Sequence, residues 1–417
     1  MAGRNWGPGT LNNTHNKTAI GSSVVGQNGG LVFVFLVAAT AALCIMYYGL
    51  GAQAFLSFPA RLSDAADEDL VAFYRASDLL RQGMPERAYD LDVFRQPFVA
   101  VHQKLMFRNP PHFFLVIAPM AYVSYGVAKF ITLLLIAVSL VVCARIARAS
   151  LGMTFGLLAS GAAYYGFTVL NISALPIAAI VFALFNAERR PLLSGLALAF
   201  ATVKPQYGLL VPVFLVVGGY WRATGWAITF TLVAAVLASV VAGPDIWLRY
   251  LAAMASEPYT EYASFVAPGN LSIQSAAGKL GFGPGQRYAL QLVGALTGAA
   301  LIVLAKRRTG KEDWIAITLL ASAIAAPHLL FYSWPLLCTA LLILIGRHGV
   351  LPPLLQLAAG LLWAQPILGT MVFAFLPHLT RPYSIAITAN ILIVLAGTCW
   401  WLSNEQRNRP VSAQHPR

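Results

Sequence analysis

Apolar runs long enough to cross a lipid bilayer recur along the chain, and they constrain its fold more than any other feature. Hydrophobic residues make up 58% of the 417 residues and charged residues only 10%. Inside a bilayer every backbone polar group must be bonded within the protein, so runs of this length are expected to be helices. The sequence therefore predicts an all-α, polytopic membrane protein. The clearest runs are Leu31–Leu50, Gly126–Val142, Thr224–Val241, Tyr288–Leu304 and Ser384–Leu402.

The composition excludes several other classes of protein. The formal net charge of +13 suits a membrane protein whose basic residues face cytoplasm and anionic lipid. No basic soluble face is visible, so no nucleic-acid partner is predicted. The four cysteines lie singly in apolar stretches, which indicates neither a zinc site nor a disulfide framework. Residues 1–30 are expected to form a disordered, polar cytoplasmic leader without a cleavable signal peptide, followed by a retained anchor.

Short basic clusters separate the apolar segments. Placing all of them in the cytoplasm gives a consistent alternation with both chain ends inside and about 11–12 transmembrane helices. The clusters are Arg145/Arg148, Arg189/Arg190, Arg222, Lys306–Arg308 with Lys311, Arg347 and Arg407/Arg409. The spans are expected at about 31–52, 126–145, 151–169, 174–187, 191–203, 205–220, 224–242, 288–305, 313–326, 328–346, 350–373 and 384–402. Residues 31–402 then form one transmembrane domain with external loops at about 53–125 and 243–287, and 403–417 form a cytoplasmic tail.

Carboxylates are concentrated in the first external loop. It holds eight of the fifteen acidic residues, which is more than solubility requires. These are Asp64, Asp67, Glu68, Asp69, Asp78, Glu86, Asp90 and Asp92. The same topology places the turn around Asn171, together with Lys204, His328 and Arg381, on the outer side. The acidic loop and these unusual polar residues are therefore expected to share one face of the membrane.

Lys204 stands alone among roughly thirty otherwise uncharged residues. An ammonium group at membrane depth is costly, so such a residue indicates a functional site. A lysine that extends from a helix end to the interface is the alternative, and the residue alone does not decide between them. Its external placement beside the carboxylate-rich loop favours the functional interpretation.

The first external loop is also expected to contain helices that lie along the membrane. Asp64 can cap a helix whose apolar positions repeat at three- and four-residue steps, namely Leu70, Phe73, Tyr74, Ser77 and Leu80. Gly83 and Pro85 should end it. Carboxylates in its first turn are ordinary for a helix N-terminus, so each one has a structural alternative to a catalytic role. A second helix should begin after Pro111.

Four blocks of residues give the chain a resemblance to glycosyltransferase family 87, a group with the GT-C architecture. The blocks are Asp69-x-x-x-Phe73-Tyr74-x-Ala76 with Gly83 and Tyr89-Asp90; Pro110-Pro111 with Pro119; Ser194-Gly195 through Lys204-Pro205; and Ala326-Pro327-His328 with Tyr332. Together they cover about residues 60–340. The chain departs from the family pattern at Asn109 (often Tyr), at Leu170-Asn171 (usually Gly-Gln) and at Ser333 (an expected Asp). These departures bear on the acceptor more than on the reaction.

The resemblance implies roles for individual residues. Asp69 takes the position of the catalytic carboxylate, and Lys204 and His328 take positions of basic groups near the donor phosphate. The secondary candidates are Asp67, Asp64, Arg108, Asn171, Tyr332 and Arg381. In the second external loop, residues that could form a lid over the acceptor are Pro244, Trp247, Tyr250, Tyr259, Tyr262 and Gln274, although aromatic side chains also collect at membrane interfaces.

These residue types suit sugar transfer from a lipid phosphate. A carboxylate within hydrogen-bond reach can take the proton of an acceptor hydroxyl, and fixed cations stabilise the charge that develops on the departing phosphate. Neither a cofactor nor a metal is expected, because Lys204 and His328 can neutralise the charge of a phosphate monoester. A cluster such as Asp64, Asp67 and Asp69 could still bind a divalent ion.

The sequence thus predicts an inverting hexosyltransferase of the plasma membrane. Its donor would be a polyprenyl-phosphate sugar, with mannose favoured by the resemblance, and its acceptor a hydroxyl of a lipid-linked or cell-envelope glycan on the outer face. A transporter or lipid flippase is the alternative, because a lone lysine and broken helices also suit transporters. No repeat relates residues 120–240 to 288–402, which counts against that alternative. A non-catalytic membrane scaffold would leave Lys204 and Asp69 without a role.

Overall fold

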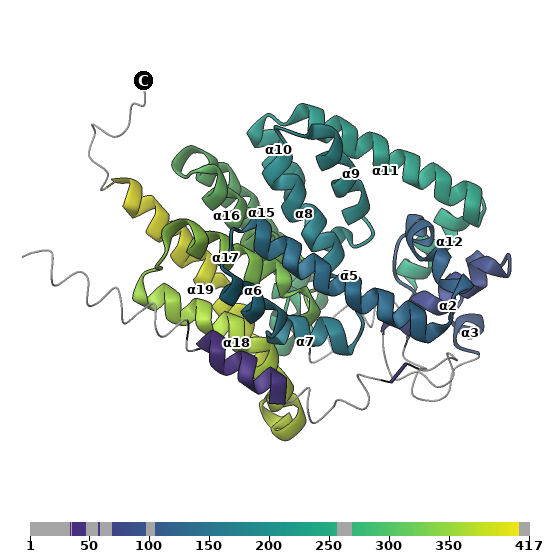
Figure 1. Cartoon of the computed structure of the whole chain (residues 1–417), viewed down its shortest axis with the longest axis horizontal. Coiled ribbons are helices and arrows are strands. Elements are labelled where there is room, and N and C mark those ends of the chain that lie inside the picture. The colour runs from purple at the N-terminus through teal and green to yellow at the C-terminus, as the bar shows by residue number, and fades with distance from the viewer. Residues whose placement is uncertain are drawn as a thin grey trace, which may run out of the picture.

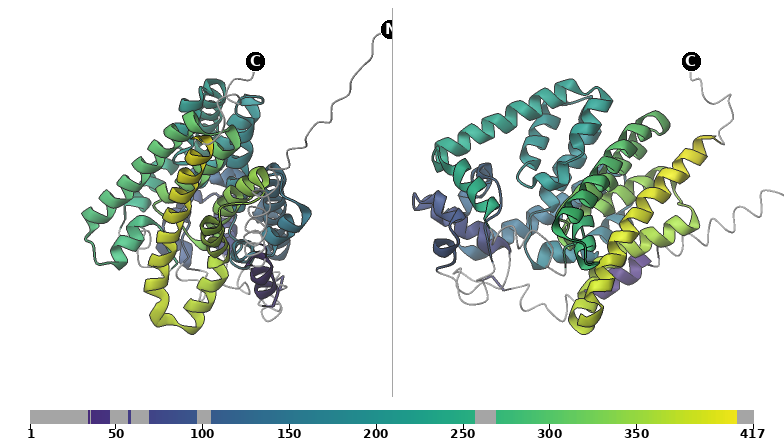
Figure 2. Two further views of the ribbon diagram at one scale, coloured as in Figure 1. Left: turned by 90° about the vertical axis from the view of Figure 1, so that its left-hand side faces the viewer. Right: turned by 180° about the vertical axis from the view of Figure 1, so that it is seen from behind.

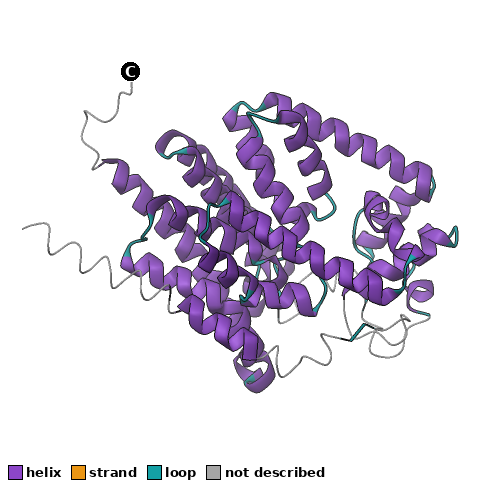
Figure 3. Cartoon of the chain, in the orientation of Figure 1, coloured by secondary structure: helices purple, strands orange, loops and turns teal. Residues whose placement is uncertain are grey.

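The computed structural model describes residues 34, 36–46, 57–58, 69–96, 105–256 and 269–407. Every regular element in these ranges is a helix, in agreement with the all-α prediction (Figure 3). Six helical segments within them are long and apolar enough to cross a membrane, which confirms a polytopic membrane protein. They are Tyr125–Ile146, Trp221–Ala242, Pro284–Arg308, Phe331–His348, Pro353–Phe375 and Pro377–Glu405. The predicted leader 1–30 lies outside the described residues, as do Asp64 and Asp67.

The described helices differ in length (Figure 1). The longest are α5 (Tyr125–Ile146), α11 (Trp221–Ala242), α15 (Pro284–Arg308), α18 (Pro353–Phe375) and α19 (Thr380–Arg407). Several predicted spans correspond to shorter helices: α6 (Leu151–Leu158), α7 (Gly161–Thr168), α8 (Ala174–Asn186), α9 (Pro191–Ala201), α10 (Val211–Gly218), α16 (Lys311–Ala325) and α17 (Pro335–His348). A further short apolar helix, Leu36–Met46, contacts α6 and α18 through Val37 and Leu36.

The predicted span at 151–169 is two helices rather than one. Ser160 interrupts it, because its hydroxyl accepts a hydrogen bond from the N–H of Ala163 at 3.2 Å and donates one to the carbonyl of Leu157 at 2.7 Å. A serine in this arrangement caps a new helix instead of continuing the old one. The next residue, Gly161, packs so closely on α18 that an added Cβ would lie 2.7 Å from the backbone nitrogen of Ile367.

The centre of the bundle is α16, which is buried from Asp313 to its last residue. A helix that is apolar on all sides belongs in the core rather than at a surface. Trp314 anchors it, because its ring stacks on Phe214 at 3.9 Å and its indole N–H donates to the carbonyl of Ile302 at 2.8 Å. By contrast α11 buries few of its residues and lies along one edge of the molecule, opposite α19 (Figures 1 and 2). Such an apolar and exposed helix is suited to contact lipid.

The Ser194-Gly195 pair has a packing role between α8, α9 and α11. The hydroxyl of Ser194 donates to the carbonyl of Ala183 at 3.1 Å, which bonds α9 to α8. A Cβ added at Gly195 would lie 2.3 Å from the Cβ of Trp226, so only glycine allows α11 to approach this closely. Small residues at helix contacts allow this kind of packing in membranes. The contact fixes α9, whose end leads directly to Lys204.

The segment predicted as the first external loop contains the predicted helix as α2 (Asp69–Arg81), with Leu70, Phe73 and Ser77 buried. Gly83 follows with a left-handed φ of 75°, which favours glycine and turns the chain away from the helix. The helices that follow in this region are η2 (Pro85–Tyr89), α3 (Leu91–Arg95), η4 (Pro111–Phe113), α4 (Phe114–Ile117) and η5 (Ala118–Tyr122). Helix formation therefore begins at Pro111, close to the predicted position.

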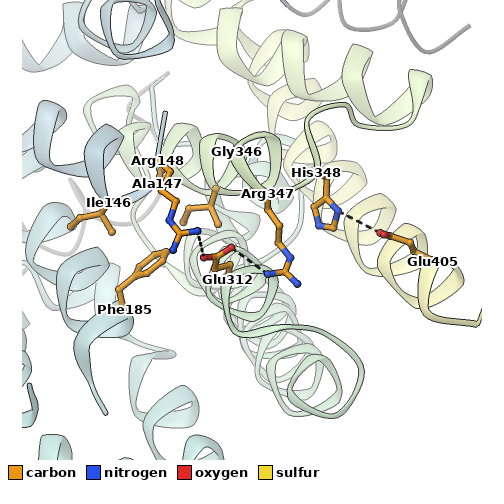
Figure 4. Close-up of a pocket in the computed structure, with 10 residues that line it drawn as sticks. Ile146, Ala147, Arg148, Phe185, Glu312, Gly346, Arg347, His348 and Glu405 are labelled. Carbon is orange, nitrogen blue, oxygen red and sulfur yellow. Dashed lines mark hydrogen bonds and ion pairs between the residues drawn. The ribbon is translucent and has the colours of Figure 1, made fainter. Parts of the chain in front are cut away.

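An ionic network joins the helix ends at one extremity of α16 and α17 (Figure 4). Glu312 pairs with Arg148 at 3.3 Å and with Arg347 at 3.2 Å. The buried Asp313 pairs with Arg347 at 3.0 Å and with His348 at 2.8 Å. The fifteen residues of α16 rise about 22 Å from this network to the loop that follows Ala325, so that loop lies at the opposite end of the bundle.

Candidate active site

A cavity of about 320 Å³ lies at the end of the bundle opposite the ionic network, and both charged and apolar side chains line it. The segments that line it come from α2, residues 105–110, the α7–α8 turn, the α9–η6 turn, α12 (Ile246–Ala255), α14 (Ile273–Lys279), the loop after α16 and η7 (Phe331–Ser333). Six of the catalytic and phosphate-binding candidates line this cavity, namely Asp69, Arg108, Asn171, Lys204, His328 and Tyr332. Arg381 does not, because it lies exposed in the first turn of α19.

Asp69 is held at the first turn of α2 by two hydrogen bonds to the α7–α8 turn. Its backbone N–H donates to the carbonyl of Val169 at 2.7 Å, and its Oδ2 accepts a hydrogen bond from Nδ2 of Asn171 at 2.5 Å. The N-terminal end of a helix favours a negative charge, which suits an ionised carboxylate. Asp69 is the only carboxylate among the described residues that line the cavity.

Lys204 is buried beside the same asparagine. Its ammonium group donates to Oδ1 of Asn171 at 2.7 Å and to the hydroxyl of Ser173 at 3.0 Å, and it lies 5.0 Å from the centre of the Tyr332 ring. Burial lowers the pKa of Lys204 to about 8; the carboxylate of Asp69 opposes this shift, and Arg108 adds to it. One amide side chain therefore holds the carboxylate on one side and the ammonium on the other.

The backbone at Lys204 is set by the segments around it. Pro205 follows directly and begins η6 (Pro205–Gly208), so α9 ends just before the lysine. Nδ2 of Asn109 donates to the carbonyl of Val203 at 3.0 Å. The hydroxyl of Tyr89 in turn donates to the carbonyl of Asn109 at 2.8 Å. Asn109, one of the departures from the family pattern, therefore joins the segment predicted as the first external loop to the turn that carries Lys204.

His328 lies in the loop between α16 and η7 (Phe331–Ser333). Gln274 holds this loop by donating to the carbonyl of Pro327 at 2.6 Å. Burial lowers the pKa of His328 to about 3, and the positive charges of Arg108 and Lys204 lower it further. The ring is thus neutral at neutral pH in the ligand-free protein, so His328 offers hydrogen bonds rather than the positive charge that its basic character suggests. Its Nδ1 is buried and has no hydrogen-bond partner among the described residues.

The turn that presents Asn171 is strained at Leu170. Its φ of 49° lies in the left-handed region, where a residue with a branched apolar side chain is uncommon. The side chain of Leu170 is fully buried, and packing compensates for the unfavourable backbone conformation. The family pattern has a glycine at this position, which is the residue that adopts this conformation without strain.

Sequence reasoning assigned no role to three residues of the site, namely Ser173, Tyr207 and Ser333, although it noted Ser333 as a departure from the family pattern. The hydroxyl of Tyr207 lies 2.8 Å from that of Ser173 and 2.8 Å from that of Ser333, and all three residues are buried. Each lies in an apolar stretch, where a hydroxyl group usually bonds the backbone of its own helix. No local sequence signal distinguishes these hydroxyls from the ordinary kind.

The proposed lid residues divide into three groups. Tyr250 and Gln274 line the cavity, whereas Pro244 and Trp247 do not. Tyr259 and Tyr262 lie outside the described residues. The two lining residues come from α12 and α14, so the segment predicted as the second external loop contributes part of the wall.

Among the described residues, the charges that line the cavity favour an anionic group over a cation. No group of three or more His, Cys, Asp and Glu side chains that could hold a metal ion is found among them. The one carboxylate that these residues contribute to the lining lies in the same cavity as Lys204 and Arg108. A cation would meet two fixed positive charges, whereas an anionic group would meet complementary charge.

A second cavity, of about 540 Å³, lies at the ionic network and has a different character (Figure 4). Its carboxylates and basic groups are paired with one another, as between Glu312 and Arg347. Such pairs stabilise the packing of helix ends. In the cavity at Asp69 and Lys204, by contrast, the described lining residues include more basic groups than carboxylates.

Fold and cavity together define a class: a polytopic, all-α membrane protein with a charged cavity at one end of its helical bundle. The family model of glycosyltransferase family 87 matches residues 107–333, more than half of the chain. The protein belongs to glycosyltransferase family 87 and is a glycosyltransferase. No curated protein and no solved structure shows significant similarity to it. The matched range includes Asn171, Lys204 and His328, while Asp69 precedes it.

Proposed function

We propose that the protein transfers a hexose, mannose in the first instance, from a polyprenyl-phosphate sugar to a hydroxyl group of a lipid-linked or cell-envelope glycan. The transfer takes place at the outer face of the plasma membrane and inverts the anomeric centre. The observation that carries the proposal is the pairing of Asp69 and Lys204 on the two ends of one amide, Asn171, inside a cavity that Arg108 and His328 also line.

The donor phosphate binds beside Lys204 and Arg108. Breaking the anomeric C–O bond adds negative charge to the departing phosphate, so fixed cations stabilise the transition state more than the ground state. Because Lys204 is already buried, its charge acts in surroundings where water screens it little. His328, which is neutral, donates a hydrogen bond to the same phosphate.

Asp69 is the general base. It accepts the proton of the acceptor hydroxyl as that oxygen bonds to the anomeric carbon, while the polyprenyl phosphate leaves from the opposite face. Asn171 positions the carboxylate by donating to one of its oxygens. A single base acting in one displacement accounts for inversion.

The distribution of charge supports the proposed orientation. Arg148, Arg347 and Lys311 lie at the helix ends that carry the ionic network, and basic ends favour the cytoplasm. The cavity lies at the other end of α16 and therefore faces outward. Sugar and acceptor lipids can approach it there from the outer leaflet.

Membership of a glycosyltransferase family favours this reaction over the alternative of a transporter or flippase. Transport moves a substrate across the membrane without forming a glycosidic bond. A base and a phosphate-binding cation held by one side chain suit bond formation.

The test is a transfer assay with the full chain, purified and reconstituted in liposomes. Separate reactions receive polyprenyl-phosphate mannose, polyprenyl-phosphate glucose or a nucleotide-activated mannose, together with a membrane glycolipid extract, and mass spectrometry detects the glycosylated products. The proposal expects product with the polyprenyl-phosphate mannose and none with the nucleotide sugar. Transfer from the nucleotide sugar alone, or passage of the lipid across the bilayer without a new glycosidic bond, would contradict it.

A further inference from the structure

A line of buried hydroxyl groups connects the loop that carries His328 to the asparagine between Asp69 and Lys204. From the loop, the backbone N–H of Leu330 donates to the hydroxyl of Ser333 at 3.4 Å. The Ser333 hydroxyl lies 2.8 Å from that of Tyr207, which lies 2.8 Å from the hydroxyl of Ser173. The Ser173 hydroxyl in turn donates to Oδ1 of Asn171 at 2.5 Å.

The orientation of the asparagine amide is determined by its partners. An ammonium group can only donate hydrogen bonds, so the amide oxygen of Asn171 must face Lys204. A carboxylate can only accept them, so the amide nitrogen must face Asp69. The amide oxygen carries no proton. The proton between Asn171 and Ser173 therefore belongs to Ser173.

Each hydroxyl has one proton, which determines the direction of the remaining bonds. Because the hydroxyl of Ser173 donates its proton to Asn171, Tyr207 must donate to Ser173. Because the hydroxyl of Tyr207 donates its proton to Ser173, Ser333 must donate to Tyr207. Ser333 itself accepts a hydrogen bond from the N–H of Leu330. All donations therefore run one way, from the His328 loop toward the asparagine.

We propose that Tyr207 is a positioning residue for the glycosyl transfer, aligning the Asn171 amide, and through it Asp69, by this one-directional chain of hydroxyl groups. The inference rests on the proposed function and extends it. Tyr207 is fully buried and Ser333 nearly so, so water does not replace a missing link without cost. The chain also couples the two walls of the cavity, since Ser333 ends η7, the short helix that contains Tyr332 and directly follows the loop that carries His328.

The first experiment removes the central link. Tyr207→Phe keeps the ring and deletes only the hydroxyl group. We expect kcat for sugar transfer to fall at least about tenfold. The donor KM should change by less than about twofold, because Lys204 keeps its own hydrogen bonds to Asn171 and Ser173 in this variant. Thermal unfolding and donor binding are measured on the same samples, so that the rate refers to folded, binding-competent protein. A kcat equal to that of the unaltered protein would overturn the inference.

The second experiment tests the direction by comparing two substitutions of Ser333 that match each other in size and shape. The amide group of Ser333→Asn can donate to Tyr207 at every pH. The carboxyl group of Ser333→Asp donates only while it is protonated, and once ionised it accepts the hydrogen bond of Tyr207 and reverses the chain. Both side chains are larger than serine, so the rate of each variant is compared with that of the other and not with that of the unaltered protein. We expect the kcat of Ser333→Asp, relative to that of Ser333→Asn, to fall at least about threefold as the pH rises through the pKa of the new carboxyl group, a change that simple loss of packing does not produce.

The outcomes separate this inference from the proposed function. If the unaltered protein transfers sugar and Ser333→Asp follows the pH profile of Ser333→Asn, the directional chain is wrong and the proposed function stands. If the unaltered protein transfers no sugar from the polyprenyl-phosphate donor, the proposed function fails and the inference fails with it.

Discussion

The charge of Lys204 makes the activity of this enzyme depend on pH in a way that an ordinary lysine would not. Its pKa, lowered by burial to about 8 from the usual 10.5, falls within the range where the protein can be assayed. Lys204 lies between two short helices, outside the six segments suited to cross the membrane. In the proposed function the phosphate of the donor binds the protonated form of Lys204, so kcat/KM should fall as the pH rises above about 8.

The size of the effect follows from the protonated fraction. At pH 9 about a tenth of the lysine side chains carry a proton, and at pH 10 about a hundredth, so kcat/KM falls about tenfold and then about a hundredfold. A lysine with an ordinary pKa would lose less than half of its charge over the same range. A bound anion favours the charged form, so the corresponding decline in kcat lies at higher pH than that in kcat/KM.

The assay is the initial rate of transfer at low donor concentration, measured from pH 6 to pH 10. Unfolding does not mimic the effect through this group: because the folded pKa is lowered, the unfolded chain binds more protons between pH 8 and 10.5, and the contribution of Lys204 to stability rises with pH there. Lys204→Gln should show a low residual rate without this alkaline decline. Lys311→Gln, at the opposite end of the bundle, serves as the control and should keep it. A kcat/KM that stays level to pH 10 in the unaltered protein would refute the reasoning.

Three further substitutions test the site and the packing that supports it. Asn171→Ala should lower kcat by about 10²-fold or more, because the carboxylate and the ammonium lose their shared partner; steady-state kinetics would show it, and retention of full activity would contradict it. Gly195→Leu should prevent folding, measured as monodisperse protein after extraction, while Gly225→Leu should not, because an added Cβ at Gly225 meets no atom within 4 Å. Arg347→Ala should lower Tm by leaving the buried Asp313 with one partner fewer, at a cost of about 1–3 kcal/mol, with kcat unchanged; an unaltered Tm would refute this.

The helical architecture could be predicted from the sequence because lipid leaves the backbone few alternatives. Runs of apolar residues marked most helices to within a few residues, as for the segment 126–145 and helix α5. The break at Ser160 was missed, since a serine inside an apolar run is as compatible with a continuous helix as with a new cap. Only the close approach of Gly161 to α18 shows why the chain turns there.

The candidate site was accessible from the sequence only in part. Lys204 was identifiable because a charge in an apolar stretch is unusual. Asp69, by contrast, is one of eight carboxylates in its segment, and the resemblance to the family pattern singled it out. The pattern of charges along the sequence predicts on which side of the membrane a residue lies, but it does not predict how far that residue is from others. Arg381 was therefore grouped with the site, although it lies away from the cavity. The lowered pKa of His328 depends on its burial and on the nearby charges of Arg108 and Lys204, and both depend on the tertiary structure.

The hydroxyl chain was beyond sequence reasoning for a different reason. Tyr207 and Ser333 are 126 positions apart and are joined by a hydrogen bond that no local pattern encodes. The direction of the hydrogen bonds in such a chain can be assigned only when every partner is known. Here the ammonium group of Lys204 and the carboxylate of Asp69 fix the orientation of the Asn171 amide, and that orientation decides which hydroxyl donates in each bond. The same residues in another fold would have no such order.

The most direct test of the account is the pair of measurements on Asp69→Asn: the rate of sugar transfer and the affinity for the polyprenyl-phosphate sugar. The substitution preserves shape and leaves an oxygen that can accept the hydrogen bond from Asn171. The account predicts a loss of turnover of about 10³-fold or more with donor affinity within about twofold, while Asp92→Asn, an exposed carboxylate of the same loop, retains full activity. Full turnover by Asp69→Asn would contradict the assignment of the base and with it the central claim.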